Sequence, residues 1–285
     1  MKKAKEYSIM ATKFDLEGKR AVITGGAGLL GRAHAEALLS IGADVDLWDI
    51  DIDKLEEVKK EIREKYPNSD IDIHKVDICQ EEQILHAIDV AYNRGKRFDI
   101  LVNNAALNPK MKKNWSDTVE KSRLENYSLE TWNQEITVGL TGAFLCSKYI
   151  GKAMSINGSG VILNIASDLS VIAPDQRIYQ KDGTHSDFQP VKPVSYSVIK
   201  SGLVGLTRYL ATYWAASGVR ANSLSPGGIF DNHSNEFVER LTNLIPMGRM
   251  ASPEDYFGAI QFLCSDASSY MTGQNLIIDG GRTVW

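Results

Sequence analysis

Three side chains in the second half of the chain have the types and spacing needed for proton transfer. Tyr196 and Lys200 stand four residues apart at the start of an expected helix, so both lie on one face of it. A free tyrosine has a pKa of about 10, and a nearby ammonium lowers that pKa because it favours the phenolate. Tyr196 could then exchange a proton with an alcohol or carbonyl oxygen. Ser167, which follows an expected strand, could hydrogen-bond the same oxygen.

A glycine-rich turn near the start of the chain has the composition of a dinucleotide site. An apolar run ends at Thr24, and Gly26, Gly28 and Gly31 follow it with the spacing G-x-G-x-x-G. Glycines at these places allow a tight turn, close approach of the backbone to a pyrophosphate, and close packing of helix on strand. The free N–H groups and the dipole at the helix start favour phosphate charge. The turn therefore predicts a bound dinucleotide.

The carboxylate of Asp49 indicates which dinucleotide is preferred. Asp49 ends the next apolar run, 18 residues after Gly31, near the roughly 20 expected for an acid that accepts from a ribose 2′-OH. It would repel a 2′-phosphate. We therefore expect NAD as the cofactor in preference to NADP.

Apolar runs alternate with helix-like periodic runs along the whole chain. The expected strands are residues 20–24, 44–49, 70–76, 100–103, 160–165, 220–224 and 275–278. The expected helices are residues 30–40, 53–65, 80–95, 129–155, 194–217, 234–244 and 253–265. This alternation predicts an α/β protein, a single-domain Rossmann fold whose seven-stranded, mainly parallel sheet carries helices on both faces. Residues 17–285 would form that one domain, after a flexible lead at residues 1–16.

Composition excludes several other classes of protein. The 285 residues are 43% hydrophobic and 24% charged, with a net charge of −4, which gives no electrostatic case for nucleic-acid binding. No stretch approaches the ~18 apolar residues of a membrane span. The cysteines at 79, 146 and 264 are widely spaced, which argues against a disulfide framework and suits a reducing cytoplasm. No His, Asp, Glu or Cys cluster has metal-ligand spacing, so we predict no catalytic metal.

Two long segments are additional to the strands and helices of a minimal α/β fold. They are residues 105–128 and 172–193, and both should leave the carboxyl ends of strands, where ligands bind in open α/β sheets. For residues 172–193 two interpretations stay open: a surface loop or subunit contact, or a wall of the substrate pocket. Under the second, Asp168, Arg177 and Tyr179 are the candidate substrate contacts.

In its ordered motifs the chain resembles the short-chain dehydrogenase/reductase family from about Leu16 to its C-terminus. The motifs are Thr24-Gly25 with the glycine turn, Asp77, Asn103-Asn104-Ala105-Ala106, Asn164-Ile165-Ala166-Ser167, Tyr196 to Lys200, Asn222 with Pro226-Gly227, and Thr272-Gly273-Gln274 with Asp279-Gly280-Gly281.

The resemblance implies a Rossmann fold, NAD(P) chemistry and a homodimer or homotetramer. It implies Tyr196 as acid/base, Lys200 as ribose ligand and modulator of the tyrosine pKa, and Ser167 as the residue that orients the substrate. Besides Tyr196 and Lys200, the implied cofactor contacts are Thr24, Gly25, Gly26, Gly28, Leu29, Leu30, Gly31, Asp49, Ile50, Asp77, Ile78, Asn103, Asn104, Ala105, Ala106, Pro226, Gly227 and Ile229.

Three departures from the family pattern matter. The turn reads T-G-x-x-G-x-x-G, a spacing typical of the extended branch with its epimerases and dehydratases, although only 85 residues follow Lys200. Gly139 stands where the family has a helical Asn that holds a proton-relay water. Three interpretations stay open: another group completes the relay, the helix is kinked at this position, or the relay is impaired. Ser167 and Tyr196 are 29 residues apart, farther than the family's usual gap.

The sequence as a whole predicts an oxidoreductase that interconverts a secondary alcohol and a ketone on a polar small molecule, a sugar or nucleotide-sugar derivative. Two alternatives remain. One is an epimerase or dehydratase with tightly bound NAD. The other is a nucleotide-binding protein without catalysis, which only Gly139 favours.

Overall fold

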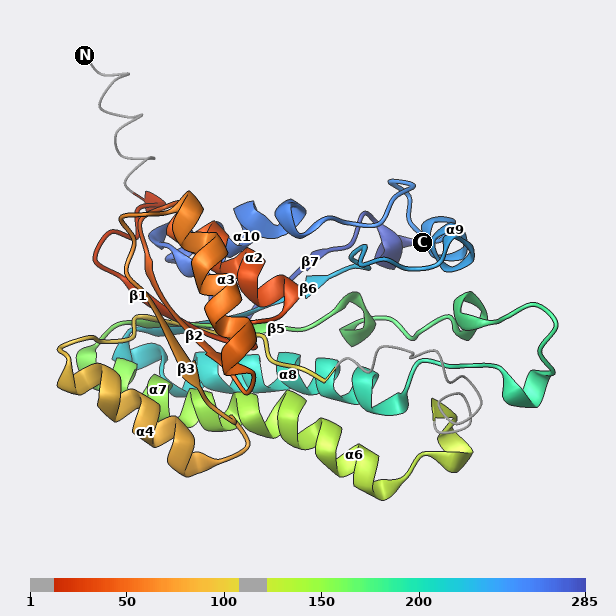
Figure 1. The fold of residues 1–285 in the computed structure, drawn as a ribbon, viewed down its shortest axis with the longest axis horizontal. Helices are drawn as coiled ribbons and strands as arrows, with labels where there is room; N and C mark the ends of the chain where they lie inside the picture. Colours follow the sequence, from red (N-terminus) through yellow and green to blue (C-terminus); the bar gives the residue numbers. More distant parts are fainter. Residues whose placement is uncertain (1–12, 108–121) are drawn as a thin grey trace, which may run out of the picture.

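The computed structural model describes residues 13–107 and 122–285 (Figure 1). Seven strands form one sheet in the order β3-β2-β1-β4-β5-β6-β7, and every neighbouring pair is parallel. The strands are β1 (Arg20–Thr24), β2 (Asp44–Asp49), β3 (Ile71–Lys75), β4 (Ile100–Asn103), β5 (Gly160–Ile165), β6 (Val219–Pro226) and β7 (Asn275–Ile278). The chain reverses its direction across the sheet between β1 and β4, and ligands bind beyond the carboxyl ends of the strands at such a switch point.

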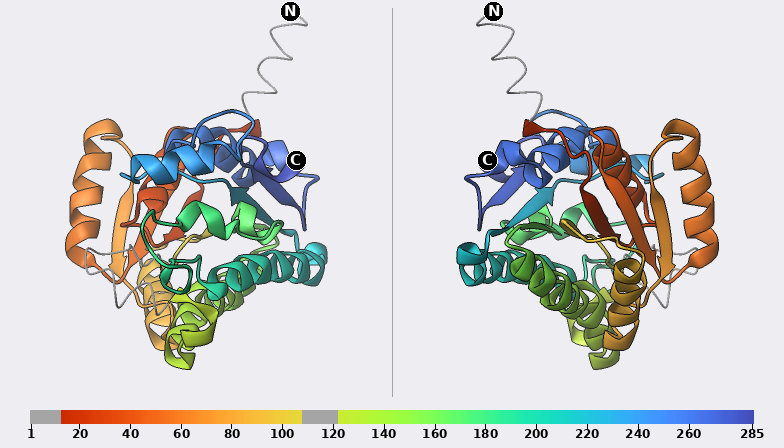
Figure 2. Two further views of the ribbon diagram at one scale, coloured as in Figure 1. Left: turned by 90° about the vertical axis from the view of Figure 1, so that its right-hand side faces the viewer. Right: turned by 90° about the vertical axis from the view of Figure 1, so that its left-hand side faces the viewer.

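Helices cover both faces of the sheet (Figures 1 and 2). One face carries α2 (Leu29–Leu39), α3 (Ile52–Lys65) and α10 (Phe257–Cys264), and the other carries α4 (Glu81–Asn93), α7 (Gly142–Asn157) and α8 (Val194–Tyr213). Two shorter helices, α6 (Leu129–Ile136) and α9 (Asn235–Thr242), lie toward the end of the molecule where the site is built. The predicted doubly covered Rossmann fold is confirmed.

The sheet is held by apolar packing on both of its faces. All five residues of β1 and all four of β4 are buried, as expected of parallel strands covered on both sides. Ile23, Leu47 and Leu38 belong to the core under α2, α3 and α10, whereas Val22 and Leu101 belong to the core under α4, α7 and α8. Alternation of the β1 side chains between the two cores fixes the position of the turn that follows Thr24.

The expected strands agree with the structure to within two residues, but one expected helix is interrupted. The predicted helix at 129–155 consists of α6, a π-helical turn at Thr137–Thr141 and α7 in succession. A turn with i→i+5 hydrogen bonds inserts one extra residue per turn and locally distorts the backbone. The predicted segment 194–217 is helical to Tyr213 and ends in a short 3₁₀ turn.

The long segment at 172–193 is compact. Its 3₁₀ turn Gln176–Tyr179 packs against α9, where Ile178 joins Leu241 and Ile245 in a small buried cluster. Of the other long segment, residues 108–121 lie outside the described residues, as do residues 1–12. Leu16 is buried and its N–H donates to Ile41 O over 2.8 Å, so packing begins by the last residue of the predicted lead. The predicted domain boundary itself stays a prediction.

Candidate active site

The glycine turn between β1 and α2 leaves no room for side chains. A Cβ on Gly31 would lie 2.1 Å from Gly25 O, and one on Gly26 would lie 2.8 Å from the Leu47 Cβ. Gly25 has a φ of +66°, a backbone conformation that residues other than glycine rarely adopt. Gly28 is the N-cap of α2, and within the described chain no side chain caps the first turn of this helix. Its N–H groups are therefore available for phosphate oxygens.

Thr24, the last residue of β1, and Asn104, which directly follows β4, support this turn. The Thr24 Oγ1 accepts hydrogen bonds from Asn104 N over 3.0 Å and Ala105 N over 3.1 Å. The Asn104 amide donates to Thr24 O over 2.9 Å and to Gly25 O over 3.2 Å. Both side chains therefore fix the loop that would cradle the cofactor, and the side chain of Ala106 lies exposed beyond them.

Asp49 lies at the carboxyl end of β2, beside the same turn. One carboxylate oxygen accepts from Ala27 N over 3.1 Å and the other from Asp51 N over 3.2 Å. Leu29, which begins α2, and Ile50, which follows Asp49, are 47% and 63% exposed. Exposed apolar side chains therefore lie next to the glycine turn and to Asp49 in the chain. Leu30 packs partly against the core.

The other predicted cofactor residues divide into surface and scaffold positions. Asp77 is half-buried and its carboxylate accepts from Cys79 N over 2.9 Å. Ile78 is buried against Gly142. The Asn103 amide donates to Asn164 Oδ1 over 2.8 Å, and its buried Oδ1 has no hydrogen-bond partner among the residues described. Asn103 thus ties β4 to β5 below the site.

At the far side of the switch point, the end of β6 approaches the C-terminal segment closely. A Cβ on Gly227 would lie 2.8 Å from the Asp279 Cα, and Gly227 N donates to Ile278 O over 2.9 Å. Ile229 forms a β-bridge with Ala251. Gly227, after Pro226 at the end of β6, therefore turns the chain sharply at the edge where the predicted nicotinamide contacts lie.

The structure brings Ser167, Tyr196 and Lys200 together between β5 and α8. The Lys200 Nζ donates to Ile165 O over 2.8 Å and lies 5.6 Å from the centre of the Tyr196 ring. Burial raises the pKa of Tyr196, and a hydrogen bond with the neighbouring Ser167 hydroxyl opposes that rise. The net shift is upward, opposite to the lowering that the sequence led us to expect. Burial lowers the pKa of Lys200 to about 8, and the charge of Lys192 adds to this effect. The three side chains therefore lie together at the carboxyl end of β5.

Ser167 is held by a buried ion pair that contains a residue the sequence did not reveal. The Ser167 hydroxyl donates to Asp168 Oδ1 over 2.8 Å, and Arg282 donates to Asp168 Oδ2 over 2.7 Å. Both charged side chains are nearly fully buried. Arg282 follows the Asp279-Gly280-Gly281 motif, but nothing in its spacing from Ser167 signals the pairing.

A second residue missed from the sequence is Lys192, at the end of the long segment. Its Nζ lies 3.7 Å from the centre of the Tyr196 ring, closer than that of Lys200. Burial lowers the pKa of Lys192 to about 8, while Asp168 and Glu135 oppose that shift. A lysine four residues before Tyr196 is the one sequence signal that could have found it.

The two predicted substrate contacts of the long segment have different positions. Tyr179 is mostly buried, and burial raises the pKa of its phenol, as does the nearby Tyr196. Arg177 has a side chain 79% exposed and forms a two-point pair with Asp175 at 2.9 and 2.7 Å. The structure therefore places Tyr179 at the site and turns Arg177 toward solvent.

Gly139 lies inside the π-helical turn and faces Ile199 of α8. A Cβ at Gly139 would lie 2.7 Å from the Ile199 Cγ2. The isoleucine thus occupies the space that a side chain at position 139 would enter. The backbone distortion that the sequence left open is present, because Gly139 is the central residue of the turn Thr137–Thr141.

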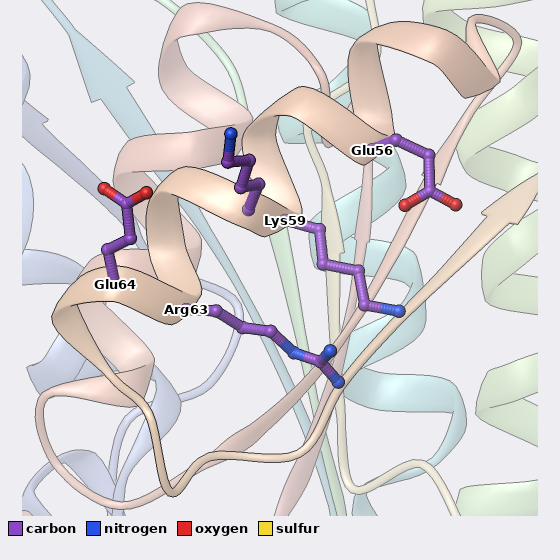
Figure 3. Close-up of a pocket in the computed structure, with 5 residues that line it drawn as sticks. Glu56, Lys59, Arg63 and Glu64 are labelled. Carbon is purple, nitrogen blue, oxygen red and sulfur yellow. The ribbon is translucent and has the colours of Figure 1, made fainter.

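Two other features of the surface and the sheet lie outside this site. A shallow depression on the outer side of α3 is lined by side chains of that helix alone (Figure 3), so no second element encloses a ligand there. The ligand atoms of Asp46, Asp72 and His74 lie within 4.8 Å of one another. Arg20, however, lies 3.5 Å from Asp46 and 3.7 Å from Asp72, so a cation already neutralises these acids. The expectation of no catalytic metal stays a prediction.

Across residues 13–107 and 122–285, no helix combines the length and apolar character required to traverse a bilayer. The cysteines at 79, 146 and 264 carry free thiols, and those at 146 and 264 are buried.

Comparison with known proteins extends over nearly the whole chain. Residues 19–179 match the family described as short chain dehydrogenase, and residues 185–283 match the one described as Enoyl-(Acyl carrier protein) reductase. The D-threitol dehydrogenase of Mycolicibacterium smegmatis is 30% identical over 292 residues, which span 100% of each chain. The NAD-dependent glycerol dehydrogenase of Listeria innocua is 33% identical, over 95% of this chain and 96% of the relative.

The solved structures agree with this relationship. A gluconate 5-dehydrogenase from Burkholderia cenocepacia, in complex with NADP and tartrate, superposes with a TM-score of 0.82 at 27% identity, over 97% of this chain and 99% of that one. Together with the switch-point glycine turn and the assembled Ser167, Tyr196 and Lys200, these matches establish that the chain belongs to the short-chain dehydrogenase/reductase family.

Proposed function

We propose that this oxidoreductase is an NAD-preferring dehydrogenase that interconverts a secondary alcohol and a ketone on a polyhydroxylated small molecule. The observation that carries the proposal is the close grouping of Ser167, Tyr196 and Lys200 at the carboxyl edge of the sheet. The polyol and sugar-acid names of the similar dehydrogenases support the substrate class.

The residues present fit a nicotinamide dinucleotide. A Cβ at Gly26 or Gly31 would collide with its surroundings, so only glycine allows the tight turn between β1 and α2. In such a turn the backbone can approach a pyrophosphate closely. When bound, the cofactor supplies the hydride acceptor. Asp49 would accept from the ribose 2′-OH, and this carboxylate favours NAD because it repels a 2′-phosphate.

Proton transfer belongs to the chain's own residues. The Ser167 hydroxyl, which donates to Asp168 in this structure, would turn its proton to the substrate oxygen and hold that oxygen beside Tyr196. The phenolate of Tyr196 would take the hydroxyl proton as the substrate is oxidised. The ammonium of Lys200 would favour that phenolate against the burial that raises the pKa of Tyr196, and the Lys200 pKa of about 8 suits it to pass the proton onward in mildly alkaline solution.

Replacement of Tyr196 by phenylalanine tests the proposal. Loss of a general acid/base lowers the rate by about 10²- to 10⁴-fold, so reduction of NAD by a polyol or sugar derivative should fall by that factor. Binding of NADH, followed by its fluorescence, should persist, which shows that the variant is folded. Unchanged turnover in Y196F would remove Tyr196 from the chemistry.

The same assay separates the two alternative functions. An epimerase or dehydratase would convert its substrate with no net change in NADH absorbance. A non-catalytic nucleotide-binding protein would bind NADH and turn over no substrate in any variant.

We also propose that α8 contributes to a homodimer or homotetramer. Tyr209 and Tyr213 are 61% and 63% exposed, and their rings stack with centroids 5.5 Å apart. Leu203 and Leu210 of the same helix are buried, so the two tyrosines occupy a separate outer face. Light scattering should report an oligomer, and Y213K should shift the mass toward the monomer; an unshifted mass would place the interface elsewhere.

A further inference from the structure

Lys192 brings a positive charge into the active site without a carboxylate in contact with it. Its Nζ lies 3.7 Å from the centre of the Tyr196 ring. Among the side chains that the structure describes, no carboxylate oxygen lies within 4.0 Å of this nitrogen. The backbone is fixed, because Lys192 N donates to Gln176 Oε1 over 2.8 Å. The ammonium is therefore held at the reacting centre by the fold and is not placed there by an ion pair.

The acidic groups around Lys192 are already bound to other partners. Asp168 accepts from Arg282 over 2.7 Å and from Ser167 over 2.8 Å. Glu135, on α6, accepts from the Tyr127 hydroxyl over 2.6 Å and also from Ser195 of α8. Both acids raise the pKa of Lys192, but burial lowers it further, to about 8.

This arrangement leaves a net positive charge around the phenol. Lys192 and Lys200 both face the Tyr196 ring, and the charge of Lys192 lowers the pKa of Lys200. Arg282 cancels the charge of Asp168, and Glu135, whose partners are the neutral hydroxyls of Tyr127 and Ser195, can offset only one of the two lysines. An ammonium removed from water without an anion costs free energy. A ligand that supplies one negative charge at Lys192 would offset that cost.

We propose that Lys192 binds the carboxylate of the substrate, and that the substrate class is a polyhydroxy monocarboxylate, an aldonic acid, rather than a neutral polyol. The inference rests on the proposed function and specifies the substrate of that same site. A single ammonium matches a single negative charge, whereas a phosphate group carries more charge and takes several donors. The carboxylate is unchanged in the reaction: the hydride leaves the carbinol carbon for the nicotinamide, and the hydroxyl proton goes to Tyr196.

Matched pairs of substrates test this inference. D-gluconate and D-glucitol share one hydroxylated carbon chain and differ in a terminal carboxylate against a hydroxymethyl group; threonate with threitol and arabinonate with arabinitol extend the comparison. A hydrogen bond to a charged group contributes about 1.5–3 kcal/mol, which corresponds to about 10- to 150-fold in kcat/KM. The unmodified protein should prefer the aldonate by a factor of this order.

In K192M the ratio of kcat/KM for the aldonate to that for the alditol should fall to about one, while any effect of the lost charge on Tyr196 should be shared by both substrates. K192R keeps the charge and should retain part of the preference. K60M, which removes an exposed lysine of α3, is the control and should change neither substrate. Circular dichroism and NADH binding establish that each variant is folded.

Several outcomes would overturn the inference and leave the proposed function intact. One is an equal loss for aldonate and alditol in K192M, since Lys192 would then act only on Tyr196. Another is a preference of the unmodified protein for alditols, and a third is a preference for a sugar phosphate over every aldonate.

If no sugar derivative is oxidised with either cofactor, the proposed function fails. Calorimetric titration of D-gluconate into the NADH complex then tests the inference alone. Binding that is lost in K192M and retained in K60M would support it, and an absence of binding to the unmodified protein would refute it.

Discussion

Replacing Gly139 by alanine tests how the interrupted helix is packed. The new Cβ would lie 2.7 Å from Ile199 Cγ2 and 3.2 Å from its Cδ1, well inside the ~3.5–4.0 Å of a favourable carbon contact. Ile199 is 7% exposed, and a β-branched residue in a helix has one strongly preferred χ1 rotamer, so it cannot swing away. Overpacking of this kind costs about 1–3 kcal/mol.

A gain in backbone entropy opposes that cost. Glycine in a helix interior is about 1 kcal/mol less favourable than alanine. The net effect of G139A is therefore a change in unfolding free energy between about zero and a loss of 2 kcal/mol. In an I199A background the clash is absent, and the same substitution should stabilise by up to about 1 kcal/mol. The coupling between the two positions should be about 1–3 kcal/mol.

Chemical denaturation of the four proteins in this cycle measures the coupling. G258A is the matched control, because Gly258 is exposed in α10 and a Cβ there meets nothing within 4 Å; it should stabilise by about 0.5–1 kcal/mol. If G139A shifts stability equally, within about 0.5 kcal/mol, in both backgrounds, the steric reasoning is refuted.

Further predictions concern charge. D49S should raise the affinity for NADPH relative to NADH by about tenfold or more, measured by fluorescence titration; an unchanged ratio would contradict the role of the acid. R282M should destabilise the fold by about 3–5 kcal/mol because it leaves Asp168 buried and unpaired. Adding D168N to R282M should restore part of the melting temperature; if it restores none, the ion pair does not stabilise the fold in this way. Because the pKa values of Lys192 and Lys200 are lowered to about 8 in the fold, the unfolded chain binds more protons than the folded chain above pH 8. The contribution of these two lysines to stability should therefore rise between about pH 8 and 10, against the buried thiols and phenols whose raised pKa values act in the opposite direction. The difference in unfolding free energy between K192M and the unmodified cofactor-free protein should change with pH over that range; a constant difference in denaturation at a series of pH values would contradict this.

The fold was largely predictable because its signals are local. The central strands β1 and β4 are short apolar runs, the glycine turn directly follows β1, and Asp49 ends β2. The interruption at Thr137–Thr141 was not predictable as a π turn, because the choice of hydrogen-bond register there depends on packing against Ile199.

The site was predictable only where a short spacing in the sequence sets the geometry. Tyr196 and Lys200 come together because four residues of helix separate them. Arg177 looked equivalent to Tyr179 in the sequence, but the local partner Asp175 holds it toward solvent. Arg282 lies 114 residues from Asp168, a distance at which no pattern in one sequence reports contact.

The sequence by itself determined the sheet, the dinucleotide turn and the pair of Tyr196 with Lys200, since periodicity and short-range geometry act within one element. The tertiary structure alone decided the charge of the pocket. It buries Arg282 against Asp168 and places Lys192 over the ring of Tyr196, because side chains from the ends of different strands and loops meet only once the sheet has assembled.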